Sequence, residues 1–270
     1  TPFYGVGHGD ALNILADVMP SHRIVGIHAV DLVCGGEFQN AFCAVRPPGH
    51  HAESRRAMGF CVFNNVAVGA AHALAVHGLA RVAIVDFDVH HGNGTEEIFS
   101  DDARVLMVST FQYPLYPYSG VANPASNMVN IPLSAGSGSD EFRDAVNDHW
   151  LPALAEFEPE LILISAGFDA HREDPLAGLA FTENDYVWVT RELMAVADLK
   201  RRNVPLKRDV IEPAIDAKVF NNPDVFPPEE TLEPIAVGGI RLGQARGDVA
   251  QHGARQAAWL FEAAGGGSRL

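Results

Sequence analysis

Short apolar runs alternate with longer helical segments through the middle of this chain. Apolar stretches bounded by turn residues predict strands, which lie at residues 42–45, 82–87, 105–110 and 161–165. Helices are predicted over 64–77 (ended by Gly78), over 139–157 (with Ser139 as N-cap) and from Thr182, where Asp185 completes a capping box. This alternation predicts a three-layer α/β fold, in which helices cover both faces of a mainly parallel sheet.

Polar residues cluster where two of these strands end. The second strand runs into Asp86-Phe87-Asp88-Val89-His90, and period-two alternation places Asp88 and His90 on the same side. Asp169 follows the strand at 161–165, and the carboxyl ends of parallel strands meet at one edge of a sheet. Carboxylate and imidazole ligands suit Zn²⁺ or Fe²⁺, so we expect Asp88, His90 and Asp169 to bind one such ion.

A third polar cluster is Arg46-Pro47-Pro48-Gly49-His50-His51-Ala52-Glu53. Tandem histidines after a rigid turn are suited to general acid–base chemistry. Each cluster alone has a structural explanation, because strand-end aspartates often cap turns and paired histidines are often surface residues. Three clusters at three strand ends favour a catalytic site.

Five segments together resemble the arginase-like zinc deacetylases, the superfamily of histone deacetylases and acetylpolyamine amidohydrolases, in particular its bacterial class II-like members. The matching segments are residues 40–53, 58–65, 86–94, 165–171 and 174–177. The resemblance covers about residues 30–199. It divides the chain into an unmatched segment (1–30), a catalytic core (31–199) and an unmatched or fused tail (200–270), and it implies a fold that is incomplete at both ends.

The resemblance also implies site roles. It makes Asp88, His90 and Asp169 the metal ligands, and it makes His50 and His51 the residues that move protons around the reacting water. Asp86 would orient His50, and Asn93 would partner His51. Gly59, Phe60 and Tyr116 would line the tunnel for the acylated side chain. A structural K⁺ would lie near Asp86, Asp88, His90 and Ser109.

The implied function is a zinc-dependent amidohydrolase that removes acetyl or acyl groups from lysine side chains or polyamines. One departure is chemical: relatives carry a tyrosine after Gly-Gly that stabilises the oxyanion, whereas this chain has no tyrosine beyond Tyr186, and residues 237–240 read Val-Gly-Gly-Ile. A metal-retaining but catalytically weak binding module is therefore the alternative function. A fragment that cannot fold stably is a third.

The composition limits the classes of partner that this chain is expected to bind. The net charge of −15 argues against nonspecific nucleic-acid binding and suits cationic substrates, although solubility alone also explains it. No apolar run approaches the ~20 residues that span a bilayer, and no leader peptide is visible, so we expect no membrane association. Three unpatterned cysteines favour a reducing cytoplasm. The sequence leaves the oligomeric state open.

The tail differs in composition, since every lysine, namely Lys200, Lys207 and Lys218, lies after position 199. Residues 203–206 and 213–230 resemble the end of periplasmic polyamine-binding proteins. This would fit a gene fusion or a misjoined reading frame, and the alternative is a divergent extension.

Overall fold

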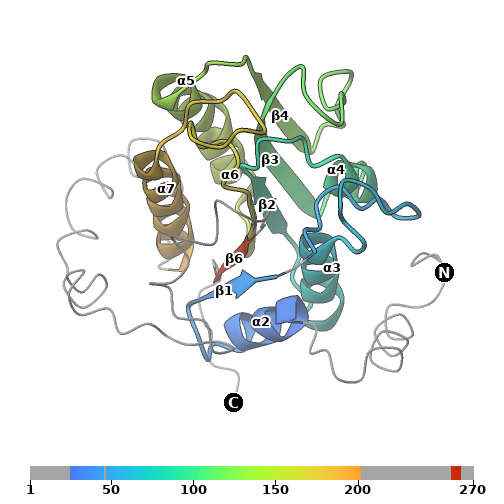
Figure 1. Ribbon diagram of the computed structural model, residues 1–270. Coiled ribbons are helices and arrows are strands. Elements are labelled where there is room, and N and C mark those ends of the chain that lie inside the picture. The colour runs from blue at the N-terminus through green and yellow to red at the C-terminus, as the bar shows by residue number, and fades with distance from the viewer. Residues whose placement is uncertain (1–24, 46, 202–256, 263–270) are drawn as a thin grey trace.

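A six-stranded sheet forms the centre of the computed structural model, which describes residues 25–45, 47–201 and 257–262. The strand order is β1-β6-β5-β2-β3-β4 (Figure 1). The strands are β1 (Asn40–Ala44), β2 (Val82–Asp86), β3 (Val105–Gln112), β4 (Met128–Leu133), β5 (Leu161–Ala166) and β6 (Ala257–Glu262). Strands β5, β2, β3 and β4 are parallel, whereas β6 is antiparallel to β1 and β5. The mainly parallel sheet predicted from the sequence is thus confirmed.

Helices cover both faces of this sheet. They are α2 (Val25–Cys34), α3 (Asn65–Val76), α4 (Asn93–Phe99), α5 (Ser139–Ala145), the π-helical turn η1 (Val146–Trp150), α6 (Leu151–Phe157) and α7 (Glu183–Arg201). One apolar core lies between the sheet and α2–α3, and the other between the sheet and α5–α7 (Figure 1). Strands β2 and β5 are buried along their whole length, which explains why their sequences are continuously apolar instead of alternating.

The helix predicted over 139–157 is interrupted. It consists of α5, η1 and α6, with Pro152 at the start of α6. A proline has no amide hydrogen and its ring clashes with the carbonyl four residues earlier, so the preceding turn widens. The predicted cap is also wrong by one residue: Gly138 is the N-cap, and its amide donates to Glu141 (2.8 Å), whereas the Ser139 hydroxyl donates to Asp185.

Four elements were not predicted from the sequence: α2, α4, β4 and β6. Strand β6 lies within the segment expected to be an unmatched tail, yet it fills the space between β1 and β5. The Val-Gly-Gly-Ile segment at 237–240 and the stretches resembling polyamine-binding proteins lie outside the described residues. No helix among the described residues is both long and apolar enough to cross a membrane.

Candidate active site

The three expected metal ligands converge beyond the carboxyl ends of two adjacent strands. Strands β2 and β5 pair with Asp86 opposite Ser165, so the segments that follow them leave the sheet side by side. His90 Nδ1 lies 3.1 Å from Asp88 Oδ1 and 3.1 Å from Asp169 Oδ2. One ligand atom from each of the three residues lies within 4.8 Å of the others. The geometry therefore brings together all three residues that the strand-end pattern selected.

Backbone hydrogen bonds hold these side chains in place. The Val89 amide donates to Asp169 Oδ1 (3.0 Å), and the His90 amide donates to Asp88 Oδ1 (2.9 Å). Gly167 faces Asp88 so closely that a Cβ there would lie 2.2 Å from Asp88 Oδ2. Only glycine fits at this position, because Cβ atoms do not approach other atoms to that distance.

The charge of the cluster fits a divalent cation. Asp88 and Asp169 are buried, and burial opposes their charged forms. The nearby His50 and His90 nevertheless hold the pKa of Asp88 well below its usual range, whereas burial and the Asp88 charge raise the pKa of Asp169. Burial also opposes a charge on His90, but the two carboxylates raise its pKa to about 10. Two buried carboxylates and one imidazole nitrogen, directed at one point, form the mixed oxygen and nitrogen set that zinc and Fe²⁺ accept.

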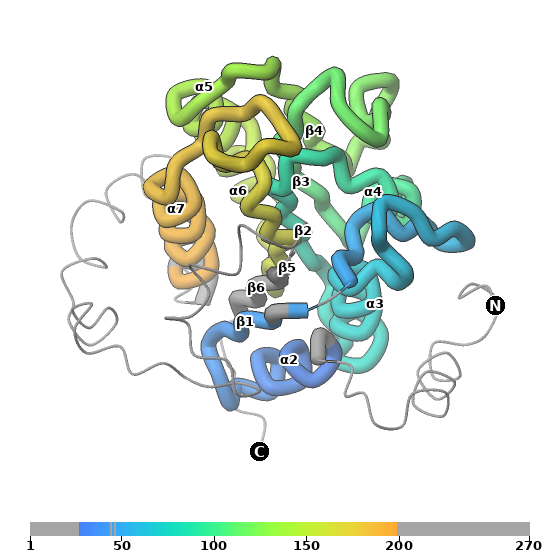
Figure 2. The backbone as a smooth tube through the Cα atoms, viewed as in Figure 1, coloured from blue at the N-terminus to red at the C-terminus, as the bar shows by residue number. Residues whose placement is uncertain are grey.

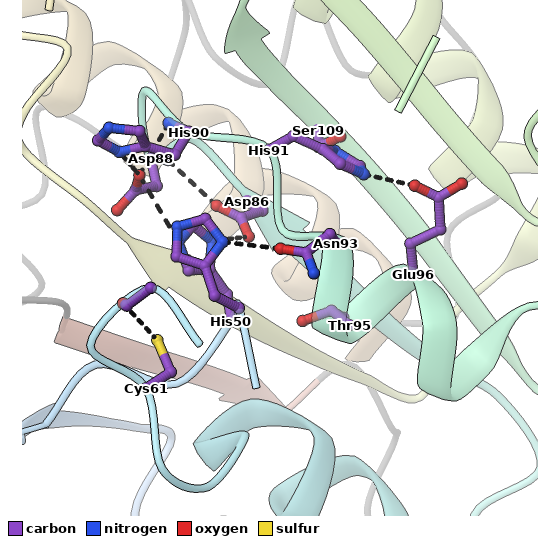
Figure 3. Close-up of polar contacts among 12 residues, drawn as sticks. His50, Cys61, Asp86, Asp88, His90, His91, Asn93, Thr95, Glu96 and Ser109 are labelled. Carbon is purple, nitrogen blue, oxygen red and sulfur yellow. Dashed lines mark hydrogen bonds and ion pairs between the residues drawn. The ribbon is translucent and has the colours of Figure 1, made fainter. Parts of the chain in front are cut away.

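His50 is tied to a carboxylate. Its Nδ1 lies 2.9 Å from Asp86 Oδ2, and its Nε2 lies 3.7 Å from Asp88 Oδ1 (Figure 3). Burial disfavours the cation, but the Coulombic attraction of Asp86 and Asp88 outweighs burial and raises the pKa of His50 to about 9. His50 is therefore protonated near neutral pH.

His51 is tied instead to a neutral amide. Its Nδ1 lies 2.9 Å from Asn93 Oδ1, and the Asn93 Nδ2 donates to Glu53 Oε1 (2.9 Å), which fixes the orientation of the amide. His51 Nδ1 therefore carries the hydrogen, and its Nε2 is left as a proton acceptor. Burial and the adjacent His50 cation lower the pKa of His51 to about 3. Two neighbouring histidines, with ring centroids 4.0 Å apart, thus have opposite protonation states.

The expected tunnel residues border this histidine pair. A Cβ on Gly59 would lie 2.2 Å from His51 Cδ2, so the glycine lets the loop pass directly over the imidazole. The Tyr116 ring stands edge-on to His51, with centroids 5.1 Å apart. Phe60 has a φ of 60° and is 89% exposed. The expected tunnel-lining residues Gly59 and Tyr116 thus pack against His51, and Phe60 presents its ring to solvent.

Comparison with known proteins places this chain in a family. The model of the histone deacetylase domain matches residues 22–206. This chain belongs to the histone deacetylase family. The matched range is slightly wider than the one that resembled the family by its motifs.

Several curated members of the family are similar to this chain. Histone deacetylase 10, chloroplastic, from Oryza sativa subsp. japonica is 46% identical over 162 residues, which cover 58% of this chain and 37% of that protein. The histone deacetylase-like amidohydrolase of Pseudomonas aeruginosa is 40% identical over 181 residues (64% and 48%), and the human polyamine deacetylase HDAC10 is 40% identical over 184 residues (64% and 28%). The chain thus spans half or less of these relatives.

A solved structure supports the fold. The crystal structure of the HDA15 HD domain has a TM-score of 0.60 and 41% sequence identity, covering 63% of this chain and 51% of that one. The α/β architecture is therefore that of a histone deacetylase domain.

Sequence reasoning missed several residues that support the site. The sequence pattern gave Glu53 no role, although it belongs to the polar cluster at 46–53. In the structure Glu53 orients the Asn93 amide. Gly92 lies so close to Asp86 that a Cβ would be 2.5 Å from Asp86 Oδ2. His91 is buried and pairs with Glu96 (Figure 3). Each lies within or next to a recognised motif, but the roles depend on contacts that connect different loops.

The loop at 47–64 links β1 to α3 and lies beside α4 (Figure 2). Helix α4 holds it there, since the amides of Gly94 and Thr95 donate to the His50 carbonyl (3.0 and 3.2 Å). These amides belong to the first turn of the helix, where no intrahelical acceptor exists. The histidine pair is thereby fixed relative to β2.

Proposed function

We propose that this chain is the catalytic core of a metal-dependent amidohydrolase that removes acetyl or other acyl groups from lysine side chains or polyamines. One observation carries the proposal: a convergent Asp88–His90–Asp169 set lies beside two histidines, one bound to a carboxylate and the other to a neutral amide. The relatives named as deacetylases and as a polyamine deacetylase support the same chemistry.

Zinc or Fe²⁺, held by Asp88, His90 and Asp169, would polarise the substrate carbonyl and lower the pKa of a water molecule. His51 accepts the proton of the attacking water on Nε2, because its Nδ1 hydrogen is directed to Asn93. His50, held by Asp86, faces the developing negative charge as a cation and donates a proton to the leaving amine. Glu53 holds the Asn93 amide in the orientation that lets its oxygen accept the His51 Nδ1 hydrogen.

The substrate enters past Gly59, Phe60 and Tyr116. An aromatic and glycine-lined wall suits an uncharged acyl-lysine or acylated polyamine chain, whereas the acidic molecule attracts the cationic remainder of either substrate. A K⁺ ion near Asp86, Asp88, His90 and Ser109 is also part of the proposal. A reducing, cytoplasmic location is proposed as well, and the three free cysteines agree with it.

A metal-retaining binding module with weak catalysis is the alternative, and the missing tyrosine beyond Tyr186 favours it. The test is to load the full chain with Zn²⁺ or Fe²⁺, count the bound metal, and measure turnover of an acetyl-lysine peptide, acetylputrescine and acetylspermidine. Metal-dependent release of acetate from any of them supports the enzyme. A metal-loaded, folded chain that binds these substrates without turnover supports the module. His149→Ala, an exposed residue outside the site, is the matched control.

A further inference from the structure

A second cluster of ligand-type side chains lies between α2 and α3 and shares no residue with the active site. Asp31 comes from α2, His72 from the body of α3, and His77 caps the C-terminus of α3. One ligand atom from each lies within 4.8 Å of the others. We propose that Asp31, His72 and His77 form a second divalent transition-metal site that links α2 to α3.

The geometry of the cluster is close to that of a bound ion. His72 Nε2 and His77 Nε2 lie 2.6 Å and 2.8 Å from the same carboxylate oxygen, Asp31 Oδ1. Zinc bonds of ~2.0–2.1 Å in tetrahedral geometry place ligand atoms about 3.3 Å apart, so each imidazole nitrogen needs to move away from the Asp31 oxygen by only roughly 0.5–0.7 Å. The two rings stand nearly perpendicular, at 73°, with centroids 5.4 Å apart. Both Nε2 atoms can therefore be directed at one ion without a change of fold.

Burial and charge also fit a cation. The His72 side chain is 7% exposed and that of His77 is 22% exposed, whereas Asp31 is 44% exposed. The cluster thus has a buried floor and one more open carboxylate, which gives an ion a route of entry. An aspartate carboxylate is ordinarily ionised at neutral pH, so Asp31 supplies the negative charge that favours a cation.

The C-terminal end of α3 also favours a bound cation at this cluster. The C-terminal end of a helix carries partial negative charge from its unpaired carbonyl groups, and this favours a cation nearby. Gly78, with a φ of +67°, ends the helix and leaves His77 in the capping position, where its ring turns toward His72. Two imidazoles with one carboxylate is a ligand set that zinc, Fe²⁺, Co²⁺ and Ni²⁺ all accept.

The competing explanation is a purely hydrogen-bonded link between the helices. The two explanations differ in metal stoichiometry, so the test removes the active-site metal first. Full-length His90→Ala protein is dialysed against Zn²⁺, and bound metal is measured by atomic absorption. We expect one equivalent to remain, no equivalent in His90→Ala/His77→Ala, and at least a tenfold weaker affinity in His90→Ala/Asp31→Asn. The asparagine retains a hydrogen-bond acceptor, so that variant keeps the link between the helices while losing the charged ligand.

Co²⁺ provides a second measurement, because its visible absorption becomes stronger when protein ligands replace water and lower its coordination number. The Co²⁺ spectrum of His90→Ala should disappear when His77→Ala is added and persist when His149→Ala is added instead. Circular dichroism confirms that each variant is folded. The proposal is overturned if folded His90→Ala binds no zinc, or if adding His77→Ala leaves its bound metal unchanged. The proposed deacetylase function is tested separately, by turnover of acetylated substrates in protein that keeps His90.

Discussion

The two adjacent active-site histidines differ in protonation state. His50 and His51 are neighbours in sequence and in space, and their surroundings separate their protonation states. The carboxylates of Asp86 and Asp88 hold the charge on His50, whereas burial and the His50 cation oppose a charge on His51. Such a difference, set by the surroundings of chemically identical side chains, is how active sites assign acid and base roles.

Replacing His90 by alanine should remove the active-site metal. His90 Nδ1 is the only nitrogen among the three convergent ligand atoms, and its loss leaves two carboxylates that bind soft divalent ions weakly. We expect zinc affinity at this site to fall at least tenfold in equilibrium dialysis, in a background where His77→Ala removes the second cluster. Unchanged metal content in both His90→Ala and Asp169→Ala, each in that background, would refute the ligand assignment.

Replacing His51 by alanine should affect catalysis far more than metal binding. His51 acts on the proton of the attacking water, so its contribution is felt in the transition state. A general base typically contributes 10²–10⁴ in rate, so we expect kcat to fall by about that factor while metal content is unchanged. Steady-state kinetics on metal-counted protein check this, with His149→Ala as the control, and an unaltered kcat would contradict the role.

At the scale of elements, α3 contains a glycine in its middle that has room for a side chain. A Cβ on Gly69 would lie 3.5 Å from Val30 Cγ2 and 3.7 Å from Leu163 Cδ1, which are ordinary contacts. Gly69→Ala should therefore stabilise the protein by about 0.5–1 kcal/mol, as alanine does within helices. Gly78→Ala is the matched opposite, because the φ of +67° makes alanine strained there. Urea unfolding should show that the free energy of unfolding rises in Gly69→Ala and falls in Gly78→Ala. A change of the same sign in both variants would contradict the argument.

The start of α7 depends on a buried carboxylate. Asp185 is fully buried and accepts hydrogen bonds from the Thr182 amide (2.8 Å), the Thr182 hydroxyl (2.9 Å) and the Ser139 hydroxyl (2.8 Å), with Arg143 at 3.3 Å. Burial opposes its charge, but these donors outweigh burial and lower the pKa of Asp185. A lowered pKa in the folded state stabilises the protein above the unfolded pKa, and this stability is lost as the pH falls through the folded value.

Asp185→Asn should therefore cost about 1–3 kcal/mol at pH 7, and the cost should shrink below about pH 4. Urea unfolding at several pH values measures the difference. Asp144→Asn, at an exposed position of α5, should show little effect at any pH. A cost for Asp185→Asn that does not vary with pH would mean that charge is not the cause.

The sequence was informative where an element ends in a chemical motif. The ends of β2 and β5, and with them Asp88, His90 and Asp169, could be predicted because parallel strands deliver their carboxyl ends to one edge. The interruption at η1 was missed although Pro152 lies in the interior of the helix predicted over 139–157, where a proline is expected to break the hydrogen-bond pattern. Helix α2 and strand β6 lack distinctive boundaries, and β6 pairs with segments remote in sequence, which no local pattern reveals. Glu53 and Gly92 act through contacts with other loops, so spacing alone could not assign them.

At the scale of the whole molecule, the convergent Asp88–His90–Asp169 set and the histidine pair occur in a sequence that has no tyrosine beyond Tyr186. Loss of one oxyanion donor typically costs 10²–10³ in rate, or ~2.7–4 kcal/mol. We expect this chain to turn over acetyl-lysine slower than a longer relative by about that factor, at equal metal content. Kinetics on both proteins check this. Tyr118, which is 71% exposed, is the residue that could replace the missing donor. The argument would be contradicted if this chain were as active as the longer relative and the Tyr118→Phe variant kept that activity.

The proposed metal ligands are also far apart along the chain. About 80 residues separate the segment that carries Asp88 and His90 from Asp169, and they meet only when β2 and β5 have paired. An unfolded chain therefore has no such site, and a cation that binds there favours the folded state by mass action. The free metal concentration of the cell would then govern how long each molecule survives proteolysis. Metal starvation would lower the abundance of the protein before it limited the activity of the molecules that remain.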